Sequence, residues 1–207
     1  FRGDKQLFAS GNASGVVRLF NPVNGAAQGV LGAHAGEVTG LLFAPNQSFL
    51  LTAGADGLVK KWPVKWPSPW IIAGHSAALT TLRVSPNQRR IASASADKTA
   101  RIWNFDDGKL LQILEGHGDT VTTVAFSPDS TQVATGCADH VARLFDANNG
   151  KLFKAFPAQG GPVKAVAIRP NGQELAAADS SGAVIIYKID DAAKLRTLTG
   201  HSGAISG

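Results

Sequence analysis

The chain has 207 residues, of which 44% are hydrophobic and 17% charged, so it is long enough and apolar enough to bury a substantial core. Its formal net charge of +5 is scattered, and the longest basic clusters are Lys60-Lys61 and Arg89-Arg90, which argues against a nucleic-acid or lipid surface. The single cysteine, Cys137, excludes an intramolecular disulfide and a cysteine-based metal site. No apolar run reaches the length of a membrane span, so we expect no membrane insertion.

Two markers recur along the chain with one period. Histidines recur at steps of 41, 42 and 84 residues, and Gln159 fills the slot inside the last step: His34, His75, His117 and His201. An aromatic residue recurs at steps of 42, 41, 42 and 42: Phe20, Trp62, Trp103, Phe145 and Tyr187. Two independent markers with a common period indicate a repeat protein, and this period is typical of a four-stranded propeller blade.

Within each period the residues predict four short strands in chain order. In the period that begins at His117, apolar and small polar residues alternate over 121–126, and small residues over 133–136 predict a second strand. A third strand is predicted at 141–145, and Asn149-Gly150 marks a tight hairpin before the fourth, at 151–156. No stretch has a sustained helical period, so the predicted class is all-β.

Consecutive periods must stack, because one four-stranded meander cannot bury both of its faces. We therefore expect a β-propeller of four-stranded antiparallel blades, with about five blades visible. The single domain 1–207 would contain units at approximately 1–33 (partial), 34–74, 75–116, 117–158, 159–200 and 201–207 (partial). Either five blades close into a ring with one blade shared by the two chain ends, or the chain is part of a larger propeller.

The Gly-His pair that opens most units and the aromatic-polar pair near their ends resemble the signature of the WD-repeat family. The aromatic-polar pairs are Phe20-Asn21, Trp62-Pro63, Trp103-Asn104, Phe145-Asp146 and Tyr187-Lys188. None is a literal Trp-Asp, but their frame agrees with the family, and the resemblance covers essentially the whole chain. It implies a protein–protein interaction scaffold. Because this family more often has seven blades, it also favours a domain or fragment of a longer protein.

The resemblance also implies a buried hydrogen-bond tetrad of His, Ser or Thr, Asp and Trp in each complete unit. The positions that match are, in the first set, His34, Thr52, Asp56 and Trp62, in the second, His75, Ser93, Asp97 and Trp103, and in the third, His117, Thr135 and Asp139. The third set has Phe145 in place of Trp, so only a triad is expected. The units with Gln159, Ala177, Ser181 and Tyr187, and with Ser10, Ser14 and Phe20, have lost the network. The repeated histidines are therefore expected to be structural.

Partners of this family usually dock around the mouth of the channel, at the positions before the turn Asp and at the start of the innermost strand. Most of these positions hold small residues here: Ala13, Ala55, Ala96, Ala138, Ser180, Ala78, Pro162 and Ala204. Glu37 and Thr120 are the candidates that remain. The segment 61–70 departs from the repeat, and its Trp66 and Trp70 either pack on a blade edge or form a docking ridge.

No catalytic residue, metal site or cofactor is predicted, and the expected partners are other proteins or other domains of the same polypeptide. An alternative is a propeller domain of an enzyme or cofactor-bearing protein, such as a quinoprotein-like dehydrogenase. That reading needs clustered acidic, Arg or metal-binding residues on the channel rim, where Ala and Thr stand instead. A second alternative is a weakly basic binder of acidic partners or nucleic acid. A small-molecule substrate is not expected.

Overall fold

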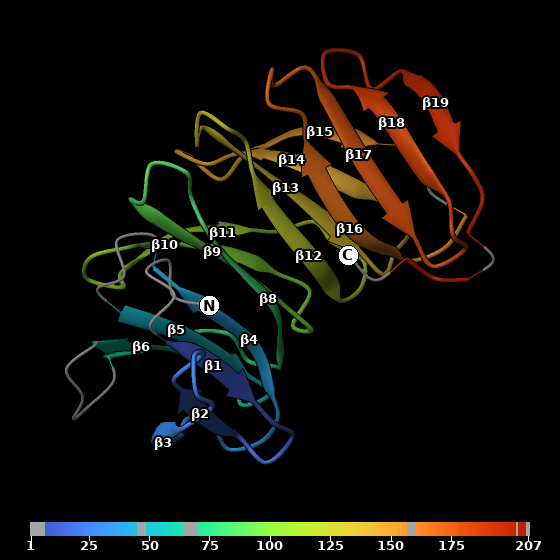
Figure 1. Cartoon of the computed structure of the whole chain (residues 1–207). Coiled ribbons are helices and arrows are strands. Elements are labelled where there is room, and N and C mark those ends of the chain that lie inside the picture. Colours follow the sequence, from blue (N-terminus) through green and yellow to red (C-terminus); the bar gives the residue numbers. More distant parts are fainter. Residues whose placement is uncertain (1–6, 45–48, 64–69, 157–159, 202, 206–207) are drawn as a thin grey trace. The chain divides into compact units, whose positions relative to one another are not determined.

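The computed structural model describes residues 7–44, 49–63, 70–156, 160–201 and 203–205. These residues form nineteen strands, and none of them lies in a helix (Figure 1). The strands group into five antiparallel sheets that follow one another along the chain. No helix in the described part of the chain is long and apolar enough to cross a membrane.

The chain divides into two compact units, Phe1–Leu82 and Arg83–Gly207. The first unit contains sheet 1, formed by β1 (Phe8–Gly11), β2 (Val16–Phe20) and β3 (Ala27–Gly32), and sheet 2, formed by β4 (Val38–Phe43), β5 (Phe49–Gly54), β6 (Val59–Pro63) and β7 (Trp70–Ile72). Sheet 3 is formed by β8 (Leu79–Val84), β9 (Arg90–Ser95), β10 (Ala100–Asn104) and β11 (Leu110–Leu114), and the boundary between the units falls within β8.

The second unit continues with two more sheets of the same order. Sheet 4 is formed by β12 (Val121–Phe126), β13 (Gln132–Cys137), β14 (Ala142–Asp146) and β15 (Leu152–Phe156). Sheet 5 is formed by β16 (Val163–Ile168), β17 (Glu174–Asp179), β18 (Val184–Lys188) and β19 (Lys194–Leu198). In both sheets the strands pair in chain order, so each sheet is a simple meander.

The sheets repeat in detail as well as in order. The pairing of the outermost strand shifts register next to the aromatic marker in four sheets, at Leu19/Phe20, Ile102/Trp103, Leu144/Phe145 and Ile186/Tyr187. The turn that precedes the outermost strand carries a glycine with φ near +70° in three sheets, Gly25, Gly108 and Gly150. Only glycine adopts that conformation at little cost, which explains the hairpin signals in the sequence.

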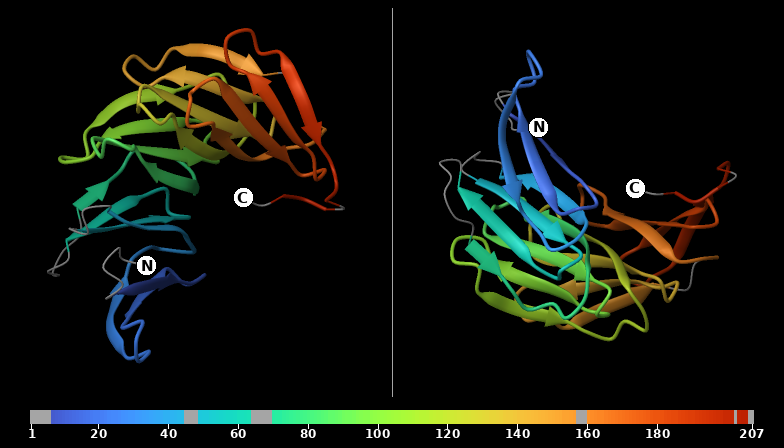
Figure 2. Two further views of the ribbon diagram at one scale, coloured as in Figure 1. Left: turned by 45° about the horizontal axis from the view of Figure 1, so that its top comes forward. Right: turned by 90° about the horizontal axis from the view of Figure 1, so that it is seen from below.

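In the second unit, sheets 4 and 5 lie against each other (Figure 2). Within each unit, apolar side chains of neighbouring sheets pack together. In the second unit, one side of sheet 4 packs on sheet 5 through Ala134, Ala142, Leu144 and Phe156, and we call this side of any sheet its forward face. The opposite side of sheet 4, the backward face, packs on sheet 3 through Val133 and Phe145. In the first unit, Val17 and Leu19 on the forward face of sheet 1 pack on Leu50 and Trp62 of sheet 2.

The predicted fold class is confirmed: the protein is all-β, and its sheets are blades of the propeller type. Each sheet lies within one of the predicted units. Sheet 1 has three strands among the described residues, and it lies in the unit 1–33, which was predicted to be partial. Whether five blades close a ring or belong to a larger propeller stays a prediction.

Candidate functional site

The polar network of sheet 2 joins the four side chains that the repeat predicts. His34 lies in the connection from β3 to β4, and its Nε2 is 2.7 Å from the hydroxyl oxygen of Thr52 in β5. Its Nδ1 is 2.8 Å from Oδ1 of Asp56, in the turn after β5. The indole N–H of Trp62 in β6 donates to Thr52 at 3.1 Å. Both ring nitrogens of His34 are therefore engaged within the protein.

Burial and hydrogen bonding set the charges of this network. Burial lowers the pKa of His34 and outweighs the neighbouring carboxylate of Asp56, which favours the protonated ring. Burial alone would raise the pKa of Asp56, but hydrogen bonds from the main-chain N–H of Ala35, from His34 and from the N–H of Leu58 together lower it. A neutral imidazole between a hydroxyl and a carboxylate is a stable structural arrangement, because every polar atom has a partner.

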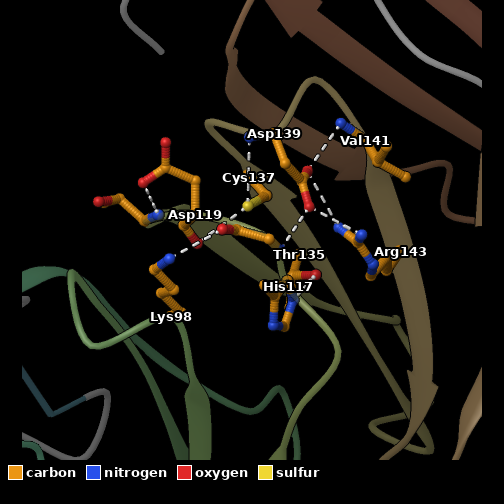
Figure 3. Close-up of polar contacts among 10 residues, drawn as sticks. Lys98, His117, Asp119, Thr135, Cys137, Asp139, Val141 and Arg143 are labelled. Atoms are coloured by element: carbon orange, nitrogen blue, oxygen red, sulfur yellow. Dashed lines mark hydrogen bonds and ion pairs between the residues drawn. The ribbon is translucent and has the colours of Figure 1, made fainter.

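The network of sheet 4 is arranged differently (Figure 3). Nε2 of His117 is 2.9 Å from the hydroxyl oxygen of Thr135, as the repeat predicts. Asp139, however, contacts the guanidinium of Arg143, with Nη2 to Oδ2 at 2.8 Å and Nη1 to Oδ1 at 3.1 Å. The predicted triad is thus reduced to a His–Thr pair, and Nδ1 of His117 is buried without a hydrogen bond to any described residue.

A planar guanidinium explains this rearrangement, because it binds both carboxylate oxygens at once. Burial, together with the positive charge of Arg143, lowers the pKa of His117 to about 4, so the ring is neutral near pH 7. Asp139 also accepts hydrogen bonds from the N–H groups of Gly118 and Val141. Although burial opposes it, this set of donors holds the pKa of Asp139 far below its usual range.

Cys137 lies beside this network and is fully buried. Its thiol is 3.1 Å from the main-chain oxygen of Asp119, to which it donates. Burial raises the pKa of the thiol, which therefore stays protonated and poorly nucleophilic. The off-frame His140 is a turn residue with φ of +69°, as predicted from its place after Asp139.

In sheet 3, the indole N–H of Trp103 donates to Ser93 at 2.8 Å. Asp97 accepts hydrogen bonds from the N–H and the hydroxyl of Thr99, and its carboxylate is 3.8 Å from the guanidinium of Arg101. His75, the fourth member of the predicted set, is buried and belongs to the first unit.

A recurring cation is part of these networks, and the sequence analysis missed it. The residue two positions before the aromatic marker is Arg18, Lys60, Arg101 and Arg143 in the first four sheets. Lys60 donates to the main-chain oxygen of Ala33 instead of the carboxylate, which leaves Asp56 available to His34. Steps of 42, 41 and 42 residues between these cations were the signal that could have found them.

A second missed feature replaces the network in sheets 1 and 5. Asp179 is fully buried and accepts hydrogen bonds from the N–H of Gly160, Ser181 and Ala183 and from the hydroxyl of Ser181. Asn12 occupies the same repeat position in sheet 1, and its side-chain oxygen accepts from the N–H groups of Ser14 and Val16. Both lie two residues before the usual turn Asp, in the strings Asn-Ala-Ser-Gly and Asp-Ser-Ser-Gly. Gln159 lies outside the described residues.

The predicted docking residues belong to different sheets. Glu37 is exposed at the start of β4, and Thr120 is half-buried at the start of β12. The main-chain N–H of Thr120 donates to the carboxylate of the exposed Asp119. Trp66 lies outside the described residues, and of Trp70 only the main chain, in β7, is described. Among the described residues, no group of three or more His, Cys, Asp or Glu side chains could hold a metal ion.

Comparison with known families agrees with this repeat. A family model described as WD domain, G-beta repeat matches the chain three times, at residues 25–63, 67–104 and 108–146. Each match ends on the residue that follows an aromatic marker, namely Pro63, Asn104 and Asp146. A comparison with curated proteins gave no match. Because the three family matches cover more than half of its length, the chain belongs to the WD-repeat family.

Proposed function

We propose that the chain is a non-catalytic scaffold for protein–protein interaction. WD-repeat domains commonly mediate such interactions, and the arrangement of polar groups supports the proposal. The observation that carries it is the engagement of His34, whose two ring nitrogens are both hydrogen-bonded inside the first unit. A histidine held in this way stiffens the turn beside it, and its fully buried side chain, beside the equally buried Thr52, is shielded from a substrate in solvent.

The docking surface that we propose in the second unit consists of Lys98, Asp119 and Thr120, which we call the turn face. Lys98 and Asp119 are exposed at the turns of sheets 3 and 4. Nζ of Lys98 donates to the main-chain oxygen of Gly118, which links the two turns. Charged groups on a rigid turn give a partner a fixed pattern of donors and acceptors, which favours specific binding over catalysis. Glu37 is the corresponding candidate in the first unit.

Affinity capture with the full chain tests this proposal. Thr120→Arg and Glu37→Arg each place a bulky cation on a candidate position. Thr131→Arg is the matched control, because Thr131 is an exposed turn residue at the other end of sheet 4. We expect Thr120→Arg or Glu37→Arg to lose proteins that the wild type and Thr131→Arg both retain, with equal thermal unfolding in all variants. Retention of every captured protein by both variants would refute these docking positions.

The segment 61–70 is a separate proposed docking element, and it needs its own variant. The double substitution Trp66→Ala and Trp70→Ala removes both indoles while the repeat frame stays intact. Lost capture with unchanged thermal unfolding would support a docking ridge. Lower thermal stability with retained capture would instead assign the two rings to packing on the blade.

A further inference from the structure

The hairpin that connects β14 and β15 contains an Asn-Gly pair, and its Asn149 is exposed. The next residue, Gly150, has φ of +71°, and its main-chain N–H donates to the main-chain oxygen of Asp146 at 2.9 Å. The side-chain oxygen of Asn149 accepts from the N–H of Lys151 at 2.9 Å. Its Nδ2 donates to Oδ2 of Asp146 at 3.3 Å. The side-chain amide of Asn149 therefore lies beside a carboxylate of its own hairpin.

The same hairpin links sheet 4 to sheet 3 within the second unit. The main-chain oxygen of Asn148 accepts from Nε2 of Gln112 in β11 at 2.7 Å. The side-chain oxygen of Asn148 accepts from Nη2 of Arg90 in β9, also at 2.7 Å. A Cβ at Gly150 would come within 3.1 Å of Oε1 of Gln112, so the hairpin passes close to β11. This link therefore depends on the conformation of residues 148–150.

We propose that Asn149 is a site of spontaneous deamidation whose carboxylate products weaken the link between sheets 3 and 4. Because Gly150 has no side chain, its main-chain nitrogen is unshielded. When the exposed hairpin opens locally, this nitrogen attacks Cγ of Asn149 and closes a five-membered imide. The Cγ–Nδ2 bond breaks, and ammonia leaves with the proton of the attacking nitrogen. Water then opens the imide at either carbonyl group and yields aspartate or isoaspartate.

The repeat shows which neighbours an aspartate has at this position. In sheet 3 the same place is occupied by Asp107, which accepts the N–H of Lys109 and pairs with its ammonium group at 3.2 Å. The residue three positions before Asp107 is the neutral Asn104, whereas in sheet 4 the corresponding residue is Asp146. Aspartate at 149 would therefore place two carboxylates side by side, where the amide of Asn149 now donates to one.

Both products of the reaction weaken the hairpin. Aspartate loses the hydrogen bond to the half-buried Asp146 and repels its carboxylate, and an ion pair with the exposed Lys151 offsets little of this. Isoaspartate adds one atom to the main chain of the hairpin, which moves Asn148 relative to Gln112 and Arg90. The modification therefore acts on the contact between two blades as well as on the turn.

Incubation of the folded full chain at neutral pH in water labelled with heavy oxygen, followed by peptide mass spectrometry, tests the reaction. We expect the peptide that carries Asn149 to lose its amide, gain one labelled oxygen and divide between aspartate and isoaspartate. Gln112→Ala removes one contact that holds the hairpin closed, so it should raise this rate severalfold and leave the rate at the Asn24-Gly25 hairpin of sheet 1 unchanged. An amide that persists at position 149 in the folded chain, or equal rates in the wild type and Gln112→Ala, would overturn the proposal.

Aspartate substitutions test the consequence of the reaction. Asn149→Asp should lower the midpoint of thermal unfolding by roughly 2–4 °C, the shift expected for the loss of one hydrogen bond in a domain of this size. The matched control Asn24→Asp should leave the midpoint unchanged, because the residue three positions before it is the neutral Asn21. Asp146→Asn combined with Asn149→Asp recreates the pair found in sheet 3 and should restore the wild-type midpoint. Equal midpoints of Asn149→Asp and Asn24→Asp, or no recovery in the double variant, would overturn the proposed weakening.

Discussion

A hydroxyl group that links two turns in the second unit allows a prediction about stability. The hydroxyl oxygen of Ser130 accepts a hydrogen bond from the main-chain N–H of Asn87 at 3.1 Å, which joins a turn of sheet 4 to a turn of sheet 3. Gly172 occupies the place of Ser130 in sheet 5, with φ of +72° against +64°. It has no hydroxyl, and a pocket of about 130 Å³ separates it from the turn at Asp129. A Cβ at Gly172 would meet no atom within 4 Å.

Gly172→Ser should therefore build the missing link to the main-chain N–H of Asp129. A side chain at positive φ costs about 1–2 kcal/mol, and the more restricted unfolded chain offsets about 0.4–1 kcal/mol of that. A new hydrogen bond contributes about 0.5–1.5 kcal/mol. The free energy of unfolding of Gly172→Ser should therefore stay within about 1 kcal/mol of the wild type, because these contributions nearly cancel.

The matched variant Gly172→Ala has the same backbone cost without the hydroxyl. In urea denaturation of the full chain, Gly172→Ser should be more stable than Gly172→Ala by about 1 kcal/mol. Ser130→Ala should lose a similar amount relative to the wild type, because it removes the existing link. Equal stability of the Ser and Ala variants at position 172 would refute the reasoning that a hydroxyl there bridges the two turns.

Three further predictions concern the polar networks. Thr52→Val should cost about 1 kcal/mol more than Thr135→Val in urea denaturation, because the hydroxyl of Thr52 donates to His34 and accepts from the indole of Trp62, whereas that of Thr135 has a histidine as its one side-chain partner among the described residues. The pKa of His117 is lower in the folded state, so the unfolded state binds more protons and stability should fall as pH drops from 6.5 towards 4, by roughly 2–3 kcal/mol. Unfolding free energies measured across this range should show a weaker slope in His117→Gln, and an unchanged slope would contradict the assignment. Asp97→Ala should lower the unfolding free energy by about 1–3 kcal/mol, since it leaves the N–H of Thr99 without its acceptor, and an unchanged thermal transition would argue against a structural role.

The fold could be predicted because the repeat indicates the strands, the turns between them and the positions that neighbouring sheets bury. The alternating apolar and small polar residues at 121–126 form β12. The predicted hairpin at Asn149-Gly150 comes directly before β15, and Gly150 has a positive φ. Each signal is local, and the period shows that neighbouring sheets bury the same positions. Ring closure is a different matter, because it depends on contacts between parts of the chain that the local pattern does not specify.

The polar networks could be predicted only in part, because their partners depend on the shape of a nearby cation. The frame correctly places His117 beside Thr135, but it does not say that Arg143 binds Asp139 through two oxygens. A lysine at the same position, Lys60, has a single ammonium group and donates to a main-chain oxygen instead. Lys and Arg are usually treated as equivalent on a surface strand, and here they decide whether the histidine keeps its carboxylate partner.

The replacement of the network in sheets 1 and 5 shows what the turn itself requires. Where the histidine and the usual turn Asp are absent, a side-chain oxygen from Asn12 or Asp179 accepts the N–H groups of the same turn. Each sheet therefore has a side-chain oxygen that accepts the N–H groups of this turn, whether or not a histidine lies beside it. The buried carboxylate of Asp179 also accepts the N–H of Gly160, just as Asp139 accepts that of Gly118, so sheets 4 and 5 each attach the segment that enters them through a carboxylate of their own turn. In sheet 4 this attachment joins Gly118 to the turn at Asp139 and stiffens the segment that carries Asp119 and Thr120, the residues proposed for docking.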